Sequence, residues 1–170
     1  MTTTGEAGED RAGPGVDRLG RILLERGWRV TTAESCTGGL IAGALTEIAG
    51  SSAWFEYGFV TYGNNAKSDM LGVSDAMLQA HGAVSEPVAV AMAEGARQRA
   101  GAEIAVSVTG IAGPDGGTPT KPVGTVWMAW AVSGRDTVAR RFRFDGDRAE
   151  VRRQTLEQAI DGLISHAQGM

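Results

Sequence analysis

The chain has 170 residues, a formal net charge of −4 and one cysteine. This length is typical of a single domain whose core folds without disulfides or a structural metal, and one cysteine excludes an internal disulfide framework. The acidic charge argues against a nucleic-acid-binding surface, which needs a concentrated basic patch, and two histidines with no Cys/His pair at ligand spacing leave little for a transition metal.

Residues 1–14 are rich in Gly, Thr, Glu and Ala and show no apolar periodicity. We therefore predict a disordered lead-in there, followed by one domain over residues 15–170. The N-terminus lacks the basic and apolar regions of a signal peptide, and no apolar run is long enough to span a bilayer. We expect a cytoplasmic protein without a membrane partner.

The first half of the domain alternates helical and extended patterns. Apolar residues at helical spacing follow Val16, and this face ends at Gly27, in a position that favours left-handed backbone. β-Branched residues predict a strand over residues 28–33, and renewed helical spacing predicts a helix over residues 38–49. Aromatic and β-branched residues then predict a strand over residues 54–62.

The second half continues this alternation and ends with an antiparallel pair of strands. The predicted elements are a short helix after Ser74, an Ala-rich helix over residues 88–100, strands over residues 103–108, 123–132 and 136–144, and a helix over residues 148–166. A short turn joins the last two strands, which therefore form a hairpin. Together the elements indicate a single three-layer α/β/α domain whose mixed sheet ends in a β-hairpin.

Three loops that follow predicted strands carry glycines together with hydroxyl or amine groups. They begin at Ser35, Tyr62 and Thr109. In open α/β sheets the ligand site lies beyond the carboxyl ends of the strands, so the convergence of these loops predicts one site.

Residues 33–39, with the sequence AESCTGG, lead from a strand into a helix. Such a turn leaves helical N–H groups unpaired at the positive end of the helix dipole, where anions and oxyanions are stabilised. Gly38 and Gly39 let a ligand approach the backbone, and Ser35 and Thr37 could act as nucleophile, donor or cap. Alternatively, these hydroxyls only cap the helix and the glycines only permit the turn.

Common catalytic motifs are absent from the sequence. It contains no G-x-G-x-x-G fingerprint, Walker A sequence, α/β-hydrolase elbow or S-x-x-K pair. A base for Ser35 must therefore come from elsewhere in the chain. His81 is one candidate, although a lone loop histidine is more often a surface or capping residue.

Lysine is the more informative candidate, because only Lys67 and Lys121 among the 16 basic side chains are lysines. A desolvated lysine can be neutral and accept a proton, whereas an arginine cannot. Both lysines are predicted to lie in loops beside glycine-rich turns, where they could equally be solvated surface groups. Tyr62 could orient or relay a proton, or pack in the core.

Six segments, in this order, resemble the CinA carboxy-terminal domain family, over a match from Val16 to the end of the chain. They are residues 33–39, residues 59–62 with 65–67, and residues 81–86, 109–117, 121–126 and 146–148. The resemblance implies a three-layer α/β fold. Because stand-alone members are nicotinamide-nucleotide amidohydrolases, it also implies hydrolysis of the carboxamide of nicotinamide mononucleotide to nicotinic acid mononucleotide and ammonia, in pyridine nucleotide salvage.

By motif, the resemblance assigns catalysis to Ser35, Tyr62 and Lys67, without a metal or another cofactor. Ser35 would attack the amide carbon, Lys67 would accept its proton, and Tyr62 would hold or relay that proton. Gly63 stands where the family often has serine or threonine, which can loosen this loop. The expected substrate-binding residues are Thr37, Gly38 and Gly39 at the helix start, for the oxyanion or alternatively the phosphate, Thr109, Gly110 and Gly113 for phosphate or ribose, and Arg148 or Lys121 for added charge.

The expected partner is a small nucleotide, and a homo-oligomer is compatible with the sequence. Longer family members carry an additional amino-terminal nucleotide-hydrolase domain, and we do not expect its activity in a chain of this length. The alternative function is a non-catalytic nucleotide-binding module of the same fold, which would not require Ser35 and Lys67 together.

Overall fold

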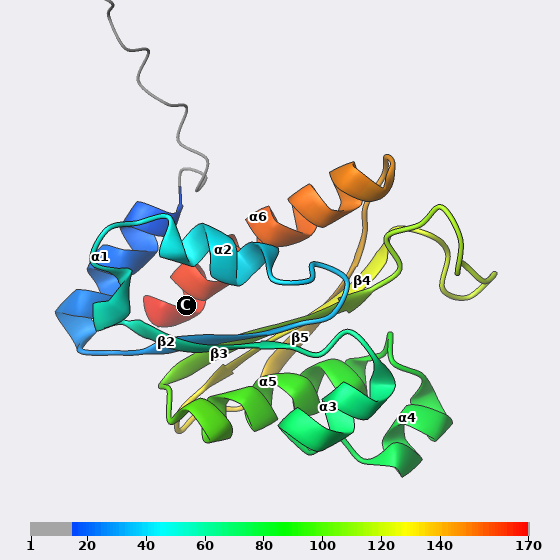
Figure 1. The fold of residues 1–170 in the computed structure, drawn as a ribbon, viewed down its shortest axis with the longest axis horizontal. Helices are drawn as coiled ribbons and strands as arrows, with labels where there is room; N and C mark the ends of the chain where they lie inside the picture. The colour runs from blue at the N-terminus through cyan, green and yellow to red at the C-terminus, as the bar shows by residue number, and fades with distance from the viewer. Residues whose placement is uncertain (1–14, 170) are drawn as a thin grey trace, which may run out of the picture.

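The computed structural model of the protein describes residues 15–169, and the lead-in predicted over residues 1–14 lies outside them. In chain order the elements are α1 (Val16–Arg26), β1 (Val30–Glu34), α2 (Leu40–Thr46), the 3₁₀ turn η1 (Ser51–Ala53), β2 (Phe55–Val60), α3 (Asn64–Leu71), α4 (Asp75–His81), α5 (Glu86–Ala100), β3 (Ile104–Gly110), β4 (Thr125–Val132), β5 (Val138–Arg143) and α6 (Arg148–Ala167). Figure 1 shows three layers, with α1, α2 and α6 on one face of the sheet and α3, α4 and α5 on the other.

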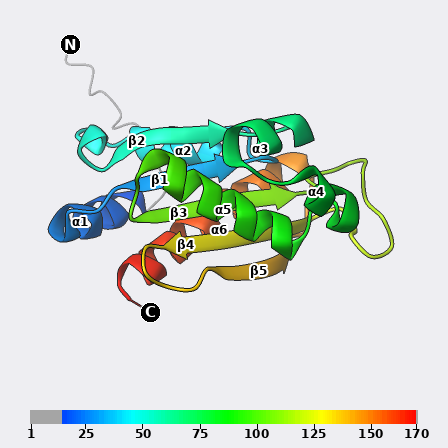
Figure 2. The ribbon, with the colours of Figure 1, turned by 90° about the horizontal axis from the view of Figure 1, so that it is seen from below.

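The sheet has the strand order β2-β1-β3-β4-β5. β1 runs parallel to both β2 and β3, whereas β4 is antiparallel to β3 and to β5. The predicted mixed sheet with a terminal hairpin is therefore confirmed. Because β1, β2 and β3 are parallel, their carboxyl ends lie at the same edge of the sheet, and the long β3–β4 connection projects beyond this edge (Figure 2).

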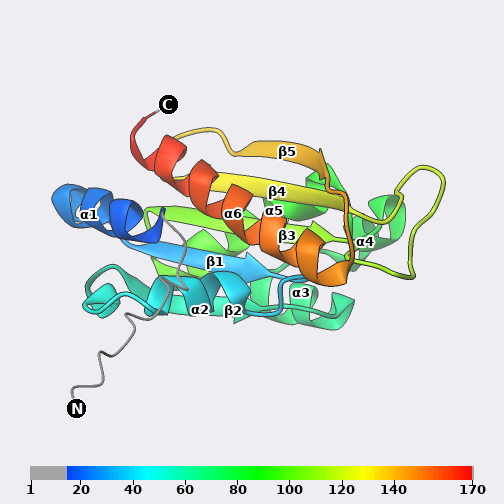
Figure 3. The ribbon, with the colours of Figure 1, turned by 90° about the horizontal axis from the view of Figure 1, so that it is seen from above.

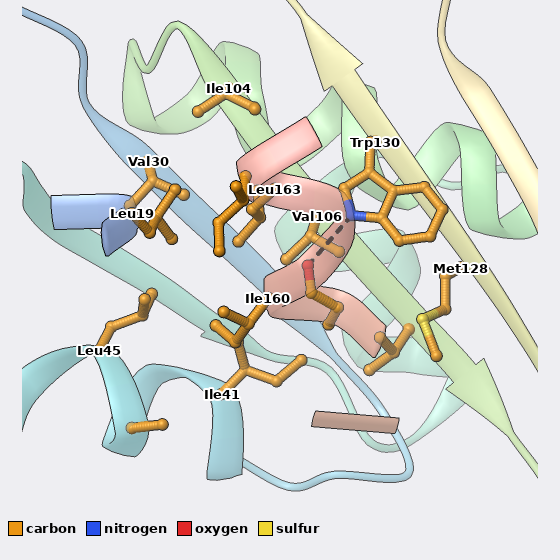
Figure 4. Packing of buried hydrophobic residues seen from close by; sticks show 14 of the residues in the cluster. Leu19, Val30, Ile41, Leu45, Ile104, Val106, Met128, Trp130, Ile160 and Leu163 are labelled. Carbon is orange, nitrogen blue, oxygen red and sulfur yellow. Dashed lines mark hydrogen bonds between the residues drawn. The ribbon is translucent and has the colours of Figure 1, made fainter. Parts of the chain in front are cut away.

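The principal core lies between the sheet and the layer that contains α6, which crosses β3 and β4 in Figure 3. Trp130 of β4 packs into this core, and its Nε1 donates a hydrogen bond to the Ala159 carbonyl of α6 at 3.2 Å (Figure 4). Gly162 lies so close to the Trp130 ring that a Cβ atom would overlap it. These two contacts fix the distance between helix α6 and the sheet. The N-terminus of α6 lies near the carboxyl ends of the parallel strands.

The opposite face of the sheet is covered at close range by α5. Small side chains make this approach possible, since alanines from the helix and the strands form their own buried cluster. The cluster consists of Ala89, Ala93, Ala105, Ala129 and Ala131. A second cluster joins α5 to α3 and α4, so the helix that carries Lys67 is anchored through α5 to the sheet.

Local turn chemistry agrees with the sequence at two helix ends. Gly27 follows α1 with a φ of 65°, and Ser74 caps α4 by accepting a hydrogen bond from the Met77 N–H. The left-handed conformation at Gly27 carries a steric cost for residues with a Cβ atom, which explains the glycine there.

The prediction of a loop around Lys67 is wrong, because residues 64–71 form helix α3. Only Lys67 and Leu71 of this helix are buried, so it lacks the apolar periodicity by which a helix is recognised in a sequence. Thr109 and Gly110 also differ from expectation, since they belong to β3 and not to the loop that follows it. Within residues 15–169, no helix is both long and apolar enough to cross a membrane.

Candidate active site

A cavity of about 230 Å³ opens where β1, β2 and β3 end. Its walls include Ser35, Tyr62, Lys67, Thr109, Gly110 and Arg148. The structure thus brings the three loops identified in the sequence to one place, together with the first residue of α6. Lys121 and His81 do not line this cavity; instead, the Lys121 ammonium donates to the His81 carbonyl at 2.8 Å.

Ser35 and Lys67 meet inside this cavity. Ser35 follows β1 directly, and its N–H donates to the Val108 carbonyl of β3 at 3.0 Å, which fixes its backbone against the sheet. Its hydroxyl lies 3.1 Å from Lys67 Nζ and its exposed fraction is 8%. A buried amine and a partly accessible hydroxyl at this distance form a nucleophile and base pair.

Lys67 is 1% exposed, and its amine has two further contacts, with the carbonyls of Thr61 and Tyr62 at 3.0 Å each. An ammonium has three N–H donors for these two carbonyls and the Ser35 oxygen, whereas a neutral amine has two donors for the carbonyls and a lone pair that can accept the Ser35 proton, so the contacts accommodate both forms. Burial lowers the pKa of Lys67 below the ordinary lysine value, and within residues 15–169 no carboxylate forms an ion pair with it. The surroundings therefore favour the proton-accepting form of the amine.

Tyr62 contacts the pair through its backbone. Its carbonyl accepts from Lys67 and lies 3.3 Å from the Ser35 hydroxyl. The phenol hydroxyl instead lies 3.3 Å from Nη2 of Arg148, and the side chain is 60% exposed at the mouth of the cavity. The expected role of the phenol in holding or relaying the proton stays a prediction, because the contacts with Ser35 and Lys67 come from the carbonyl.

Thr37, Gly38 and Gly39 lie beside the Ser35 cavity and line a neighbouring one of about 410 Å³. The Gly38 N–H donates to the Ser35 carbonyl at 3.0 Å, so it is already paired. Within residues 15–169, neither the Cys36 N–H nor the Thr37 N–H donates to a backbone carbonyl, although the Cys36 N–H contacts its own thiol. The donors nearest in sequence to Ser35 are thus these two groups, and not the N-terminus of α2 itself.

Glu34 is a residue that the sequence analysis missed. Its carboxylate is fully buried and accepts from the Thr37 hydroxyl at 2.6 Å and from the N–H groups of Ile41 and Ala42 at 2.8 and 3.0 Å. The positive end of α2 is therefore neutralised by the chain's own carboxylate. An acidic residue immediately before Ser35, in a strand that is otherwise buried, was the available signal.

Arg148 closes one side of the cavity. Its guanidinium donates to the Gly113 carbonyl at 2.9 Å and to the Tyr62 hydroxyl, which holds a cation at the mouth. Thr109 lines the cavity with its hydroxyl donated to the Ala83 carbonyl at 2.9 Å, and Gly110 lies next to it. Gly113 does not line the cavity, and it participates only by orienting Arg148.

Cys36, next to the candidate nucleophile, is not a competing one. Burial raises the pKa of its thiol to about 12, so the thiolate is scarcely populated near neutral pH. Within residues 15–169, no three His, Cys, Asp or Glu side chains come together in a way that could hold a metal ion. Metal-independent activity stays a prediction.

Comparison with known proteins places these residues in a family. The family model described as the CinA C-terminal domain matches residues 14–167. The nicotinamide-nucleotide amidohydrolase PncC of Escherichia coli is 57% identical over 147 residues, which cover 86% of this chain and 89% of the relative. The protein of the same name from Pseudomonas putida is 55% identical over 147 residues, covering 86% of this chain and 91% of the relative.

Solved structures show the same relationship. A CinA superfamily protein from Klebsiella pneumoniae superposes with a TM-score of 0.89 at 40% identity, covering 95% of this chain and 99% of the other. The competence/damage inducible protein CihA from Agrobacterium tumefaciens superposes with a TM-score of 0.88 at 47% identity, covering 95% and 98%. The sequence match over nearly the whole described chain and the shared fold agree: the chain belongs to the CinA C-terminal domain family.

Proposed function

We propose that this protein hydrolyses the carboxamide of nicotinamide mononucleotide to nicotinic acid mononucleotide and ammonia, with Ser35 as nucleophile and Lys67 as its base. The observation that carries the proposal is the 3.1 Å contact between the Ser35 hydroxyl and a buried amine without a counter-ion, inside a cavity. The names of the relatives at 55–57% identity support the substrate.

In the first step, Lys67 accepts the hydroxyl proton while Ser35 Oγ attacks the amide carbon. The carbonyl oxygen becomes an oxyanion, which the N–H groups of Cys36 and Thr37 would stabilise, because neither donates to a backbone carbonyl within residues 15–169. The ammonium form of Lys67 is stabilised at the same moment, because three acceptors surround it: Ser35 Oγ and the carbonyls of Thr61 and Tyr62.

Collapse of this intermediate breaks the C–N bond, and Lys67 returns the proton to the departing nitrogen, so ammonia leaves. The ester on Ser35 is then attacked by water, with Lys67 again accepting the proton and returning it to Ser35 Oγ. The net reaction consumes one amide and one water and yields one carboxylate and one ammonium ion. A neutral amine at rest is required for both halves, which agrees with the direction of the pKa shift of Lys67.

Arg148 is the cation best placed for an anionic substrate, because it lines the cavity and Tyr62 and Gly113 hold its guanidinium in position. A phosphate at Arg148 would position the amide over Ser35 from a distance. The exposed Tyr62 ring at the same mouth offers an aromatic face to the pyridinium. The aromatic side chain of Tyr62 would thus contact the substrate, while its backbone carbonyl contacts Lys67 and Ser35.

The decisive experiment is to incubate the purified protein with nicotinamide mononucleotide, without added metal or cofactor, and to measure ammonia and the acid product. We expect turnover, and we expect hydroxylamine to trap the acyl group as a hydroxamate. Binding of the nucleotide without ammonia release would instead favour the non-catalytic binding module. Turnover by Ser35→Ala at the wild-type rate would contradict the nucleophile assignment.

A further inference from the structure

We propose that Arg152 is a positioning residue that holds the turn after Ser35, so that the backbone N–H groups of this turn are presented to the oxyanion. The inference rests on the proposed amide hydrolysis at Ser35. Arg152 lies in the second turn of α6, more than a hundred residues from Ser35 in the chain. It does not line the Ser35 cavity, so its action would be indirect.

The guanidinium of Arg152 contacts two successive carbonyls of the turn. Its Nε donates to the Cys36 carbonyl and its Nη2 to the Thr37 carbonyl, at 3.2 Å each. The side chain lines the neighbouring cavity of about 410 Å³, together with Thr37, Gly38 and Gly39. The two carbonyls are thus held toward the Arg152 side chain of α6.

Peptide geometry converts this contact into a direction for the donor. In a planar trans peptide, the carbonyl and the following N–H point in opposite directions. When Arg152 holds the Cys36 carbonyl, the Thr37 N–H must point away from Arg152, and within residues 15–169 it has no acceptor. An N–H kept free in a fixed direction is what an oxyanion-binding donor requires.

The turn needs external support because two of its residues are glycines. Gly38 and Gly39 have φ values of 57° and 106°. These values lie in the left-handed region, which carries a steric cost for residues with a Cβ atom. Glycine also gives the chain the greatest freedom to leave this conformation. A turn of this composition keeps a single conformation only if other groups fix its peptides.

Glu34 supplies the support on the opposite side. Its carboxylate accepts from the Thr37 hydroxyl, while Arg152 donates to the Thr37 carbonyl. Thr37 is therefore fixed at its side chain by an anion and at its backbone by a cation. Glu34 also carries the N-terminus of α2 and is fully buried, so its replacement threatens the fold; Arg152 is only half-buried and is the better position to test.

The test compares Arg152→Met and Arg152→Lys with the matched control Arg153→Met. Arg153 follows on the same helix but faces solvent, and among residues 15–169 its ion pairs are with Glu150 and Glu157. We expect Arg152→Met to lower kcat for nicotinamide mononucleotide by about 10²-fold, because small misplacements of a catalytic group have effects of this size. KM should change little, and the control should match the wild type.

Arg152→Lys should recover only part of the loss, since an ammonium cannot reproduce the fork of donors that reaches both carbonyls. Circular dichroism and thermal unfolding report the folded fraction of each variant. A kcat loss that only follows a loss of folded protein would overturn the inference, as would a loss confined to KM. Wild-type kcat in both Arg152 variants would overturn it as well.

A second readout separates this inference from the choice of substrate. Ser35 Oγ attacks the phosphorus of an aryl fluorophosphonate, fluoride leaves, and Lys67 accepts the hydroxyl proton; mass spectrometry detects the new phosphorus–oxygen bond without any amide. We expect Arg152→Met to slow this labelling and Arg153→Met to leave it unchanged. If the wild type is labelled but does not deamidate the nucleotide, the proposed function fails and the inference stands on the labelling difference. Equal labelling of wild type and Arg152→Met would overturn the inference.

Discussion

Two bases in this protein, Lys67 and His166, have pKa values lowered by burial, and they lie in different surroundings. Lys67 lies at the carboxyl ends of the parallel strands, inside a cavity and 3.1 Å from a hydroxyl. His166 lies near the end of α6 and stacks on Trp130, with a ring centroid separation of 5.5 Å. Its pKa is lowered by burial first, and then by the positive charges of Arg140 and Arg135.

The difference shows that a perturbed base marks a reactive site only in combination with a partner and an accessible space. Lys67 has a nucleophile to deprotonate and room for a substrate, whereas His166 has an aromatic ring beside it and two arginines nearby. The chemistry is therefore expected to depend on Lys67, and His166 is expected to affect only stability.

The largest effect is expected from replacing the base itself. Lys67→Met and Lys67→Arg should each lower kcat/KM by at least about 10²-fold, because neither side chain can accept the Ser35 proton. Ammonia release from nicotinamide mononucleotide measures the loss. His166→Gln is the matched control and should keep wild-type activity. Near wild-type turnover by Lys67→Arg would contradict a neutral-amine mechanism.

The second effect concerns the anion site at the cavity mouth. Nicotinamide riboside lacks the phosphate, and losing two or three charge-assisted hydrogen bonds should lower kcat/KM by at least about 10²-fold. Inorganic phosphate should compete with the mononucleotide. Arg148→Ala should reduce the ratio of kcat/KM for the mononucleotide to kcat/KM for the riboside. Comparable kcat/KM values for riboside and mononucleotide would instead favour binding through the pyridine ring.

The third effect is the pH dependence of catalysis. Since burial lowers the pKa of Lys67, the neutral amine should persist to lower pH than in an ordinary lysine, and kcat/KM should fall as the pH drops through this lowered pKa. Kinetics over a pH series locate the acidic limb. His166→Gln should leave the pH of this acidic fall in kcat/KM unchanged. A shift of the fall in this variant would show that it reports the titration of His166 and not that of Lys67.

The smallest effect is expected from His166, on the pH dependence of the free energy of unfolding. Its pKa in the folded state is below the unfolded value of 6.5, so the unfolded state binds more protons between these two values. The free energy of unfolding should therefore fall as the pH drops below 6.5 and through the lowered pKa. Denaturant unfolding of wild type and His166→Gln measures the difference, and identical pH dependence in both would show that the histidine makes no contribution.

Local patterns in the sequence determined much of the fold. The strands carry β-branched and apolar residues, the hairpin has a short turn, and Gly27 and Ser74 mark helix ends by conformation and capping. These signals depend on neighbours within a few residues, so they can be recognised in the sequence without the tertiary structure. The same is true of residues 33–39, whose motif indicated both the turn and the family.

Helix α3 could not be predicted from local patterns, because its buried residues are Lys67 and Leu71 and do not form an apolar face. Its placement follows from packing against α5. The contact between Ser35 and Lys67 likewise depends on the parallel pairing of β1 with β2, which brings residues 32 positions apart into hydrogen-bond distance.

Tertiary structure also decided which groups are free to act. The sequence indicated an anion site at the start of α2, but the Glu34 carboxylate occupies those N–H groups and Gly38 bonds to Ser35. Arg148 reaches the cavity and Arg152 reaches the turn after Ser35, both from α6, whose position is set by the close contact of Gly162 with Trp130. A motif specifies which donors and charges are present, whereas their pairing depends on distances that only the folded chain establishes.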